Sequence, residues 1–350
     1  YQLKRLDDER LLLVPRSTED PKYIPVYEAI AGRPAMATGL RDEAFEALAK
    51  LKQTSVAAEM LNVISKTKPE DTNSRRLIEQ LTRVMLERPE DELKSIQEGL
   101  QETAEEGQSW LRSIGFAGLI TIGQTDSALD LADQDSESTL AMLAAIRRIP
   151  DQSLRVAQRS YAIRKFEATD SADVKRAAMD AISRIADQQS DTFSRLIVLV
   201  DDPEVRMAAC RSLLRVPSDI YQPELAASAA ESLVKFAEST EAANRTSDSF
   251  IDAMQLAERL MTKIPRATAK MLRDRLREIT VRVDKTGTIE EELRYDVPYF
   301  AVEAGRPLQI LLENHDLMPH NLVVTQPGAL KGVAMAGLAA GPSGTGGLPY

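Results

Sequence analysis

The chain contains very little cysteine, histidine and aromatic residue, and each shortage excludes a class of protein. Cys210 is the only cysteine among the 350 residues, which excludes an internal disulfide and a zinc site built from several cysteines. The two histidines, His315 and His320, lie in one short segment, so a Ser-His-Asp catalytic site elsewhere in the chain is excluded. Aromatic residues make up 5% of the chain, and the abundance of alanine, leucine, arginine and glutamate favours helix.

The sequence also has no excess of positive charge and no long apolar run. The chain has 44 basic and 54 acidic side chains, a net charge of −10 and a pI near 5.0. This balance argues against a nucleic-acid-binding protein, because such proteins carry a basic surface. No apolar run approaches the roughly 18 residues that a membrane-spanning helix needs, so we expect no membrane span here. The sequence starts at Tyr1 in what reads as the middle of a domain, and it stops abruptly at Tyr350. We therefore expect an internal piece of a longer protein, in which a missing signal peptide says nothing about compartment.

Residues 41–279 read as one helix after another. Apolar side chains recur there at three- and four-residue spacing, between short breaks of aspartate, serine, threonine and proline. Residues 173–185 match residues 204–216 at a constant offset of 31, and looser copies lie at 41–51 and 145–150. A period of about 30 to 45 residues with one helix pair per period is typical of an α-solenoid. The sequence therefore predicts a helical repeat structure.

The repeat has a recognisable opening at residues 202–206, Asp-Pro-Glu-Val-Arg. We expect Asp202 to cap the helix and Pro203 to occupy its first turn. Small residues follow, where neighbouring helices must approach closely. This pattern resembles HEAT repeats, most closely over residues 171–216. The resemblance implies an all-α solenoid over residues 37–277, with a surface on which a protein partner binds.

The segments before and after the helices read differently. Residues 1–36 contain a strand-like run at residues 10–15 and are predicted to be the tail of an upstream domain. After Arg277 the apolar period changes from 3.6 to 2. We expect strands at residues 279–283, 293–302 and 308–312, with turns at 285–288 and 303–307, which together begin an antiparallel β-sandwich. This predicted all-β domain covers residues 278–350, and its end, from Gly337 on, is predicted to be a loop.

Both histidines fall in the loop after the last of these strands, and Met318-Pro319-His320-Asn321 is its centre. Pro319 restricts the backbone before His320. The loop resembles the first copper-ligand loop of the cupredoxins, the blue-copper proteins that include plastocyanin and azurin. Residues 300–308 resemble the strand, Ala-Gly-x-Pro and strand that lead into it. The resemblance implies the N-terminal part of a cupredoxin sandwich, in which His320 ligates copper and Asn321 supports it through hydrogen bonds between the ligand loops.

A type 1 copper site needs two imidazole nitrogens and a thiolate in one plane, with a weak axial ligand that is usually methionine. In the family the remaining Cys, His and Met come from one late loop, so we expect them to lie beyond Tyr350. Cys210 sits in a predicted helix and is interpreted as a small packed residue. Met318 and Met335 are likewise interpreted as packing residues, and His315 as a solvent-facing one.

These resemblances imply a copper-binding protein that passes single electrons to redox partner proteins, with one type 1 copper site carried on a helical-repeat scaffold. Multidomain bacterial proteins of planctomycete type have such an arrangement, and they imply a periplasmic or secreted location. An electron carrier is favoured over a catalyst. Two alternatives stay open: a non-catalytic interaction scaffold with a metal-free cupredoxin-like module, and a piece of a larger copper oxidoreductase.

Overall fold

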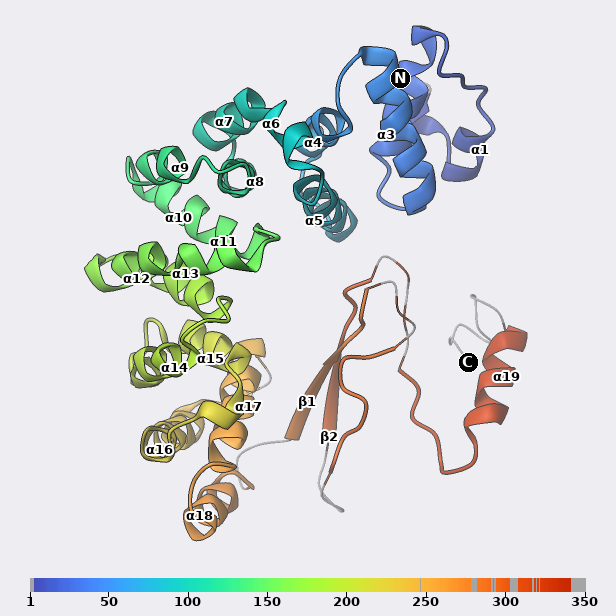
Figure 1. The fold of residues 1–350 in the computed structure, drawn as a ribbon. Helices are drawn as coiled ribbons and strands as arrows, with labels where there is room; N and C mark the ends of the chain where they lie inside the picture. The colour runs from blue at the N-terminus through green and yellow to red at the C-terminus, as the bar shows by residue number, and fades with distance from the viewer. Residues whose placement is uncertain are drawn as a thin grey trace. The chain divides into compact units, whose positions relative to one another are not determined.

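A computed structural model describes residues 3–245, 247–277, 282–290, 292, 294–302, 308–316, 318, 320 and 322–340. The chain divides into two compact units, Tyr1–Val281 and Arg282–Tyr350. The described residues are mostly helical, with two short strands in the second unit (Figure 1). The prediction of an all-α part is therefore confirmed. The finer division into residues 1–36, 37–277 and 278–350 stays a prediction.

The first unit consists of helices joined by short connections. Its α-helices are α1 (Asp8–Leu12), α2 (Ile24–Ala31), α3 (Thr38–Lys52), α4 (Val56–Lys66), α5 (Thr72–Leu86), α6 (Glu90–Lys94), α7 (Gln97–Glu106), α8 (Ser109–Thr121), α9 (Thr125–Ala132), α10 (Ser136–Ala145), α11 (Gln152–Ala157), α12 (Arg159–Ala168), α13 (Ala172–Ser183), α14 (Gln189–Ile197), α15 (Arg206–Arg215), α16 (Pro223–Ser239), α17 (Asp248–Met261) and α18 (Arg266–Arg277). Short 3-10 helices accompany them: η1 (Leu3–Arg5), η2 (Pro21–Tyr23), η3 (Ile146–Arg148), η4 (Val198–Asp201), η5 (Ser218–Ile220) and η6 (Ala242–Asn244).

Several of the aspartate and serine breaks in the sequence cap these helices. The side chains of Asp135 and Ser171 each accept a hydrogen bond from the backbone N–H three residues later, at the starts of α10 and α13. An acceptor at this position satisfies an N–H group that the first turn leaves unpaired. The cap predicted at Asp202 is wrong, because α15 begins only at Arg206. The Asp202 carboxylate accepts from Glu204 N in the preceding turn instead.

The helices from α8 to α17 pack in chain order. α8 contacts α10, α10 contacts α13, α13 contacts α15 and α15 contacts α17, while α9, α12, α14 and α16 each pack beside at least one helix of this series. The matching segments 173–185 and 204–216 contain most of α13 and α15, so they occupy neighbouring places in the series (Figure 1). Side chains at equivalent positions of the two segments therefore follow one another from helix to helix.

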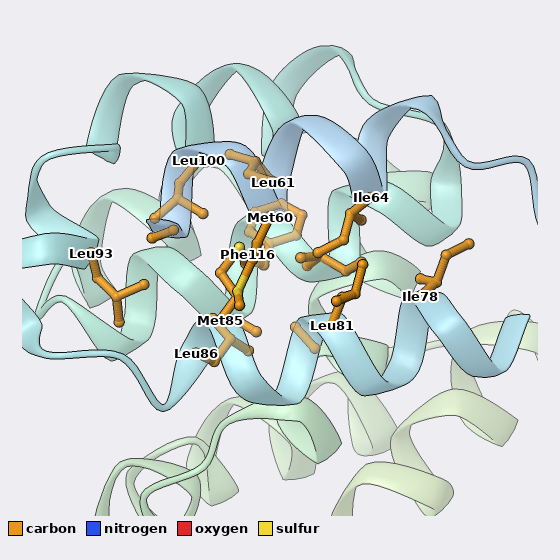
Figure 2. Packing of buried hydrophobic residues seen from close by; sticks show 14 of the residues in the cluster. Met60, Leu61, Ile64, Ile78, Leu81, Met85, Leu86, Leu93, Leu100 and Phe116 are labelled. Carbon is orange, nitrogen blue, oxygen red and sulfur yellow. The ribbon is translucent and has the colours of Figure 1, made fainter. Parts of the chain in front are cut away.

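The core of the first unit consists of apolar side chains at these helix contacts. Figure 2 shows one part of it, where Met60 of α4, Leu81 of α5, Leu100 of α7 and Phe116 of α8 lie in one cluster of buried residues. A second cluster continues through residues 179–276. Full burial of a large apolar side chain stabilises the fold by about 1.5–3 kcal/mol. The helices are therefore held by this packing more than by intrinsic helix propensity.

Residues 10–15 do not form the predicted strand. Residues 8–12 form helix α1 instead, which the Asp7 carboxylate caps by accepting a hydrogen bond from Arg10 N at 2.8 Å. Leu11 is fully buried in the core. Periodicity alone does not distinguish a strand from a helix in a short apolar run, and here the cap and the burial of Leu11 favour the helix. The assignment of residues 1–36 to an upstream domain stays a prediction.

The second unit contains two strands, β1 (Arg282–Gly287) and β2 (Leu308–Glu313), and one helix, α19 (Leu330–Ala340), among its described residues. The strand predicted at residues 308–312 is confirmed. The antiparallel arrangement is wrong for this pair, because β1 and β2 run parallel, from Arg282 opposite Leu308 to Gly287 opposite Glu313. The chain must therefore return to the start of β1 before β2 begins.

Other local predictions for this unit are corrected. The turn predicted at residues 285–288 is wrong, because β1 runs on to Gly287. The described residues of the strand predicted at 293–302 form an isolated bridge, between Tyr295 and Thr288. Tyr299 and Val302 are 76% and 53% exposed, so the apolar positions of the alternating pattern are not buried as those of a strand in a sheet are. Residues 337–340, predicted as loop, belong to α19. Residues 278–281 and 303–307 lie outside the described residues.

Candidate metal-binding loop

A loop follows β2, and the structure describes its residues 314–316, 318 and 320. Hydrogen bonds join Asn314 and His315 to Thr288, directly after β1. Thr288 donates from its hydroxyl to Asn314 Oδ1 at 3.0 Å and accepts from His315 N at 2.8 Å. Asn314 Nδ2 in turn donates to the carbonyl of Met318 at 2.8 Å. Polar side chains thus fix the backbone of this loop by bonding to main-chain groups.

Asp316 lies in the middle of the loop and is buried. Its backbone N–H donates to Asn314 Oδ1 at 3.0 Å, and its Oδ1 accepts from Met318 N at 3.3 Å, as in an Asx turn. Its other carboxylate oxygen, Oδ2, lies 3.0 Å from His320 Nε2. The side chains of Asp316 and His320 are only 4% and 10% exposed, so the pair is largely shielded from water.

The contact with Asp316 orients the His320 ring and distinguishes its two nitrogens. Because Nε2 faces the carboxylate, Nδ1 is the nitrogen that can bind a metal without breaking the contact. Metal-binding histidines commonly donate their other ring N–H to a carboxylate, which fixes the tautomer and raises the basicity of the ligand. His320 therefore fits the role of one metal ligand. Among the described residues, no group of three or more His, Cys, Asp or Glu side chains is placed to hold a metal ion.

The other histidine and two methionines of the second unit have exposed side chains. His315 is 58% exposed, as predicted for a solvent-facing residue. The interpretation of Met318 and Met335 as packing residues is wrong, because these side chains are 51% and 58% exposed. Pro319, predicted to restrict the backbone before His320, and Asn321, to which the resemblance assigns a supporting role, lie outside the described residues.

Cys210 belongs to the first unit, where it lies in α15 and is fully buried. Burial raises the pKa of its thiol to about 12, because the thiolate would lose its hydration in the apolar interior. Since the thiolate is the reactive and metal-binding form, this thiol is a poor nucleophile and a poor ligand. The interpretation of Cys210 as a packing residue is confirmed.

We expect Cys210 to be unreactive in the folded protein. A chromogenic thiol reagent at neutral to mildly alkaline pH should leave the native chain unmodified and should label the unfolded chain at once. The contribution of Cys210 to stability is constant below the unfolded thiol pKa of about 8.5. It falls as the pH rises from there toward about 12, because only the unfolded chain releases the proton. In Cys210→Ala, the stability should not show this part of the decrease at alkaline pH. Rapid labelling of native protein would contradict the expectation.

Sequence reasoning missed the pairing of Asp316 with His320. The two residues are four apart, a spacing that brings side chains together on a helix. Here an irregular turn brings them together, and the spacing alone does not reveal it.

Comparison with family models, with curated proteins and with solved structures finds no match to this chain. The resemblances to HEAT repeats and to cupredoxins therefore rest on the residues quoted for them. None of the described helices is long and apolar enough to cross a membrane.

Proposed function

We propose that His320 is the first ligand of a type 1 copper site and that the protein transfers single electrons. The observation that carries the proposal is the buried Asp316–His320 pair, in which a carboxylate 3.0 Å from Nε2 leaves Nδ1 as the metal-binding nitrogen. A ligand already held in place by its neighbours needs little rearrangement when the metal binds.

Copper, when bound, supplies the one-electron chemistry. This chain contributes a ring held by Asp316 and a loop tied to β1 through Thr288. By the cupredoxin resemblance, Asn321 would connect the ligand loops, and a thiolate, a second imidazole and a thioether would come from sequence after Tyr350. The partners would be redox proteins of the periplasm or of the cell exterior.

The first unit supports a second candidate function, a protein-interaction scaffold with a metal-free β module. The supporting observation is the neighbour-to-neighbour packing of α8, α10, α13, α15 and α17. In this candidate the helices are a solenoid of HEAT-like repeats, which sets equivalent side chains in a row along an extended binding surface. The two functions are compatible within one protein.

Copper loading of the full-length protein tests the first candidate. We expect the strong visible absorption of a copper–thiolate bond, and its loss in His320→Ala. His315→Ala is the matched control, because that side chain is 58% exposed, and it should keep the absorption. A colourless copper-loaded protein, or a His320→Ala variant that keeps the absorption, would contradict the copper site.

A second variant covers the case in which removal of the buried His320 ring disturbs the loop. Asp316→Asn keeps the size of the side chain and removes its charge, so the ring loses its charged partner but stays in place. We expect copper affinity to fall by roughly ten- to hundredfold, with the melting temperature unchanged. An unaltered affinity would show that Asp316 does not support the ligand.

A further inference from the structure

Five arginines follow one another along the packed helices of the first unit. Arg147 and Arg148 lie in η3, directly after α10. Arg184 directly follows α13, and Arg211 and Arg215 lie on α15. The helices α10, α13 and α15 are consecutive members of the packed series. Arg184 and Arg215 occupy equivalent positions of the 31-residue repeat. These five residues form what we name the arginine row.

Carboxylates of neighbouring helices already bind to this row. The two carboxylate oxygens of Glu79 accept from Arg148 at 2.6 and 2.9 Å. Asp180 lies between two arginines, 2.9 Å from Arg184 Nε and 3.0 Å from Arg215 Nη1. The planar guanidinium group presents its donors in a fork that matches a carboxylate. The arginines of the row therefore present their N–H donors in an arrangement that binds carboxylates.

The row keeps an excess of positive charge and of donors. A third carboxylate, Asp252, pairs with Arg211 at 2.7 Å, so in these pairs five guanidinium groups share three carboxylates. Arg211 is 54% exposed and uses Nε for its pair. Arg147 is 41% exposed, and its hydrogen bond to Glu79 is long, at 3.4 Å. Within the described part of the chain, the remaining N–H groups of Arg147 and Arg211 meet no acceptor.

The arginines also lie close enough to repel one another. Burial lowers the pKa of Arg147 and of Arg215, and neighbouring arginines of the row lower both further. The pKa of a cation falls near other cations because its charged form is disfavoured. An added anion would relieve this repulsion, although the chain as a whole has a net charge of −10.

The spacing of the row favours an extended ligand. Packed helices lie about 8–10 Å apart, and α10, α13 and α15 are packed in series. The helices next to Arg147 and under Arg211 are therefore about two such spacings apart, while Arg184 and Arg215 meet on Asp180 between them. A polyproline-II segment turns once in three residues and advances about 3.1 Å per residue. Every third side chain therefore lies on one face, about 9 Å from the next. An acidic segment with a carboxylate at each third position could therefore reach both Arg147 and Arg211, the two most exposed arginines of the row.

We propose, as an extension of the interaction role, that the arginine row binds an acidic segment of a partner protein in extended conformation, with a carboxylate at every third residue. Arg147 and Arg211 provide donors that the ligand can reach, and Arg184 and Arg215 provide positive charge between them. A nucleic acid suits the row less well. The carboxylates of Glu79 and Asp180 lie within the row and would repel a continuous chain of phosphates. A segment with carboxylates only at every third residue can place uncharged residues opposite Glu79 and Asp180.

Fluorescence anisotropy with a labelled peptide that has glutamate at every third residue tests this proposal on the 350-residue chain. We expect saturable binding, and roughly tenfold weaker binding by the double variant R147Q/R211Q. A peptide with the same glutamates gathered in one block should bind more weakly than the spaced peptide. R10Q/R273Q is the matched control, because it changes the net charge equally at two other partly exposed ion pairs, and it should bind as the parent chain does.

Three results would overturn the proposal: no saturable binding, equal weakening in R10Q/R273Q, or tighter binding of a single-stranded oligonucleotide of the same charge. Thermal melting followed by circular dichroism shows whether the variants keep the fold. If R147Q/R211Q melts early, R211Q alone decides the question, since its side chain is more than half exposed, and unchanged binding by it counts against the row. A colourless full-length protein that still binds the peptide would refute the copper site and leave this proposal standing.

Discussion

Replacement of Arg41 by leucine should lower the free energy of unfolding by about 3 kcal/mol. Arg41 lies in the first turn of α3 and is 2% exposed. One terminal nitrogen donates to the carbonyls of Arg33, Pro34 and Met36 at 3.0, 3.3 and 2.8 Å, and the other donates to Gln80 Oε1 at 3.1 Å. Leucine occupies part of the same space but offers no donor. Each buried acceptor that loses its partner costs about 1–3 kcal/mol, and removal of the buried charge offsets part of the sum.

Urea unfolding followed by helical circular dichroism measures this loss. Arg10→Leu is the matched control, because Arg10 also lies in a helix but its side chain is 74% exposed. Its effect should stay within about 0.5 kcal/mol. If Arg41→Leu lowers the free energy of unfolding no more than the control does, water must hydrogen-bond to the three carbonyls in the variant. That result would contradict the role assigned to Arg41.

Gly115→Ala should destabilise the protein by about 2–3 kcal/mol, for a steric reason. Gly115 lies in α8, where a Cβ added to it would be 2.5 Å from Ala104 N and 2.7 Å from Leu100 O. Both atoms belong to the backbone of α7, which cannot turn aside as a flexible side chain does. The two helices would have to move apart, and the packing around Phe116, the next residue and a fully buried one, would loosen.

Gly39→Ala is the control for this substitution, because it makes the same change in helix α3. A Cβ added at Gly39 has no atom within 4 Å, so the higher helix propensity of alanine should stabilise the protein by about 0.5 kcal/mol. The two variants should therefore shift the melting temperature in opposite directions. A neutral or stabilising Gly115→Ala would show that α7 and α8 separate easily.

Much of the helical part could be predicted because helix signals are local. The apolar period of residues 41–279 and the cap at Ser171 act within one or two turns. The strand at residues 308–312 was predictable for the same reason, since alternation is a property of one segment. Its parallel pairing with β1 was not predictable, because strand direction and register depend on a partner 26 residues away, as in Arg282 opposite Leu308.

The candidate site divides in the same way. The choice of His320 as the candidate ligand comes from its immediate neighbours in sequence and from the cupredoxin resemblance that they carry. Its environment does not, because the loop is tied to Thr288, which lies 27 residues before His315, and because the pairing with Asp316 needs the turn that those bonds create. Asn321 lies outside the described residues, so its supporting role stays a prediction.

Composition and local pattern therefore suffice for the helical character of residues 41–277, for strand β2 and for the choice of His320 as the candidate ligand. The contacts between distant residues had to come from the folded structure. Arg41 meets Gln80 across 39 residues, and in the arginine row Glu79 and Arg148 are 69 residues apart. Such contacts depend on which helices pack together. That packing is set by the combined burial and fit of side chains from many segments, which no short window of sequence contains.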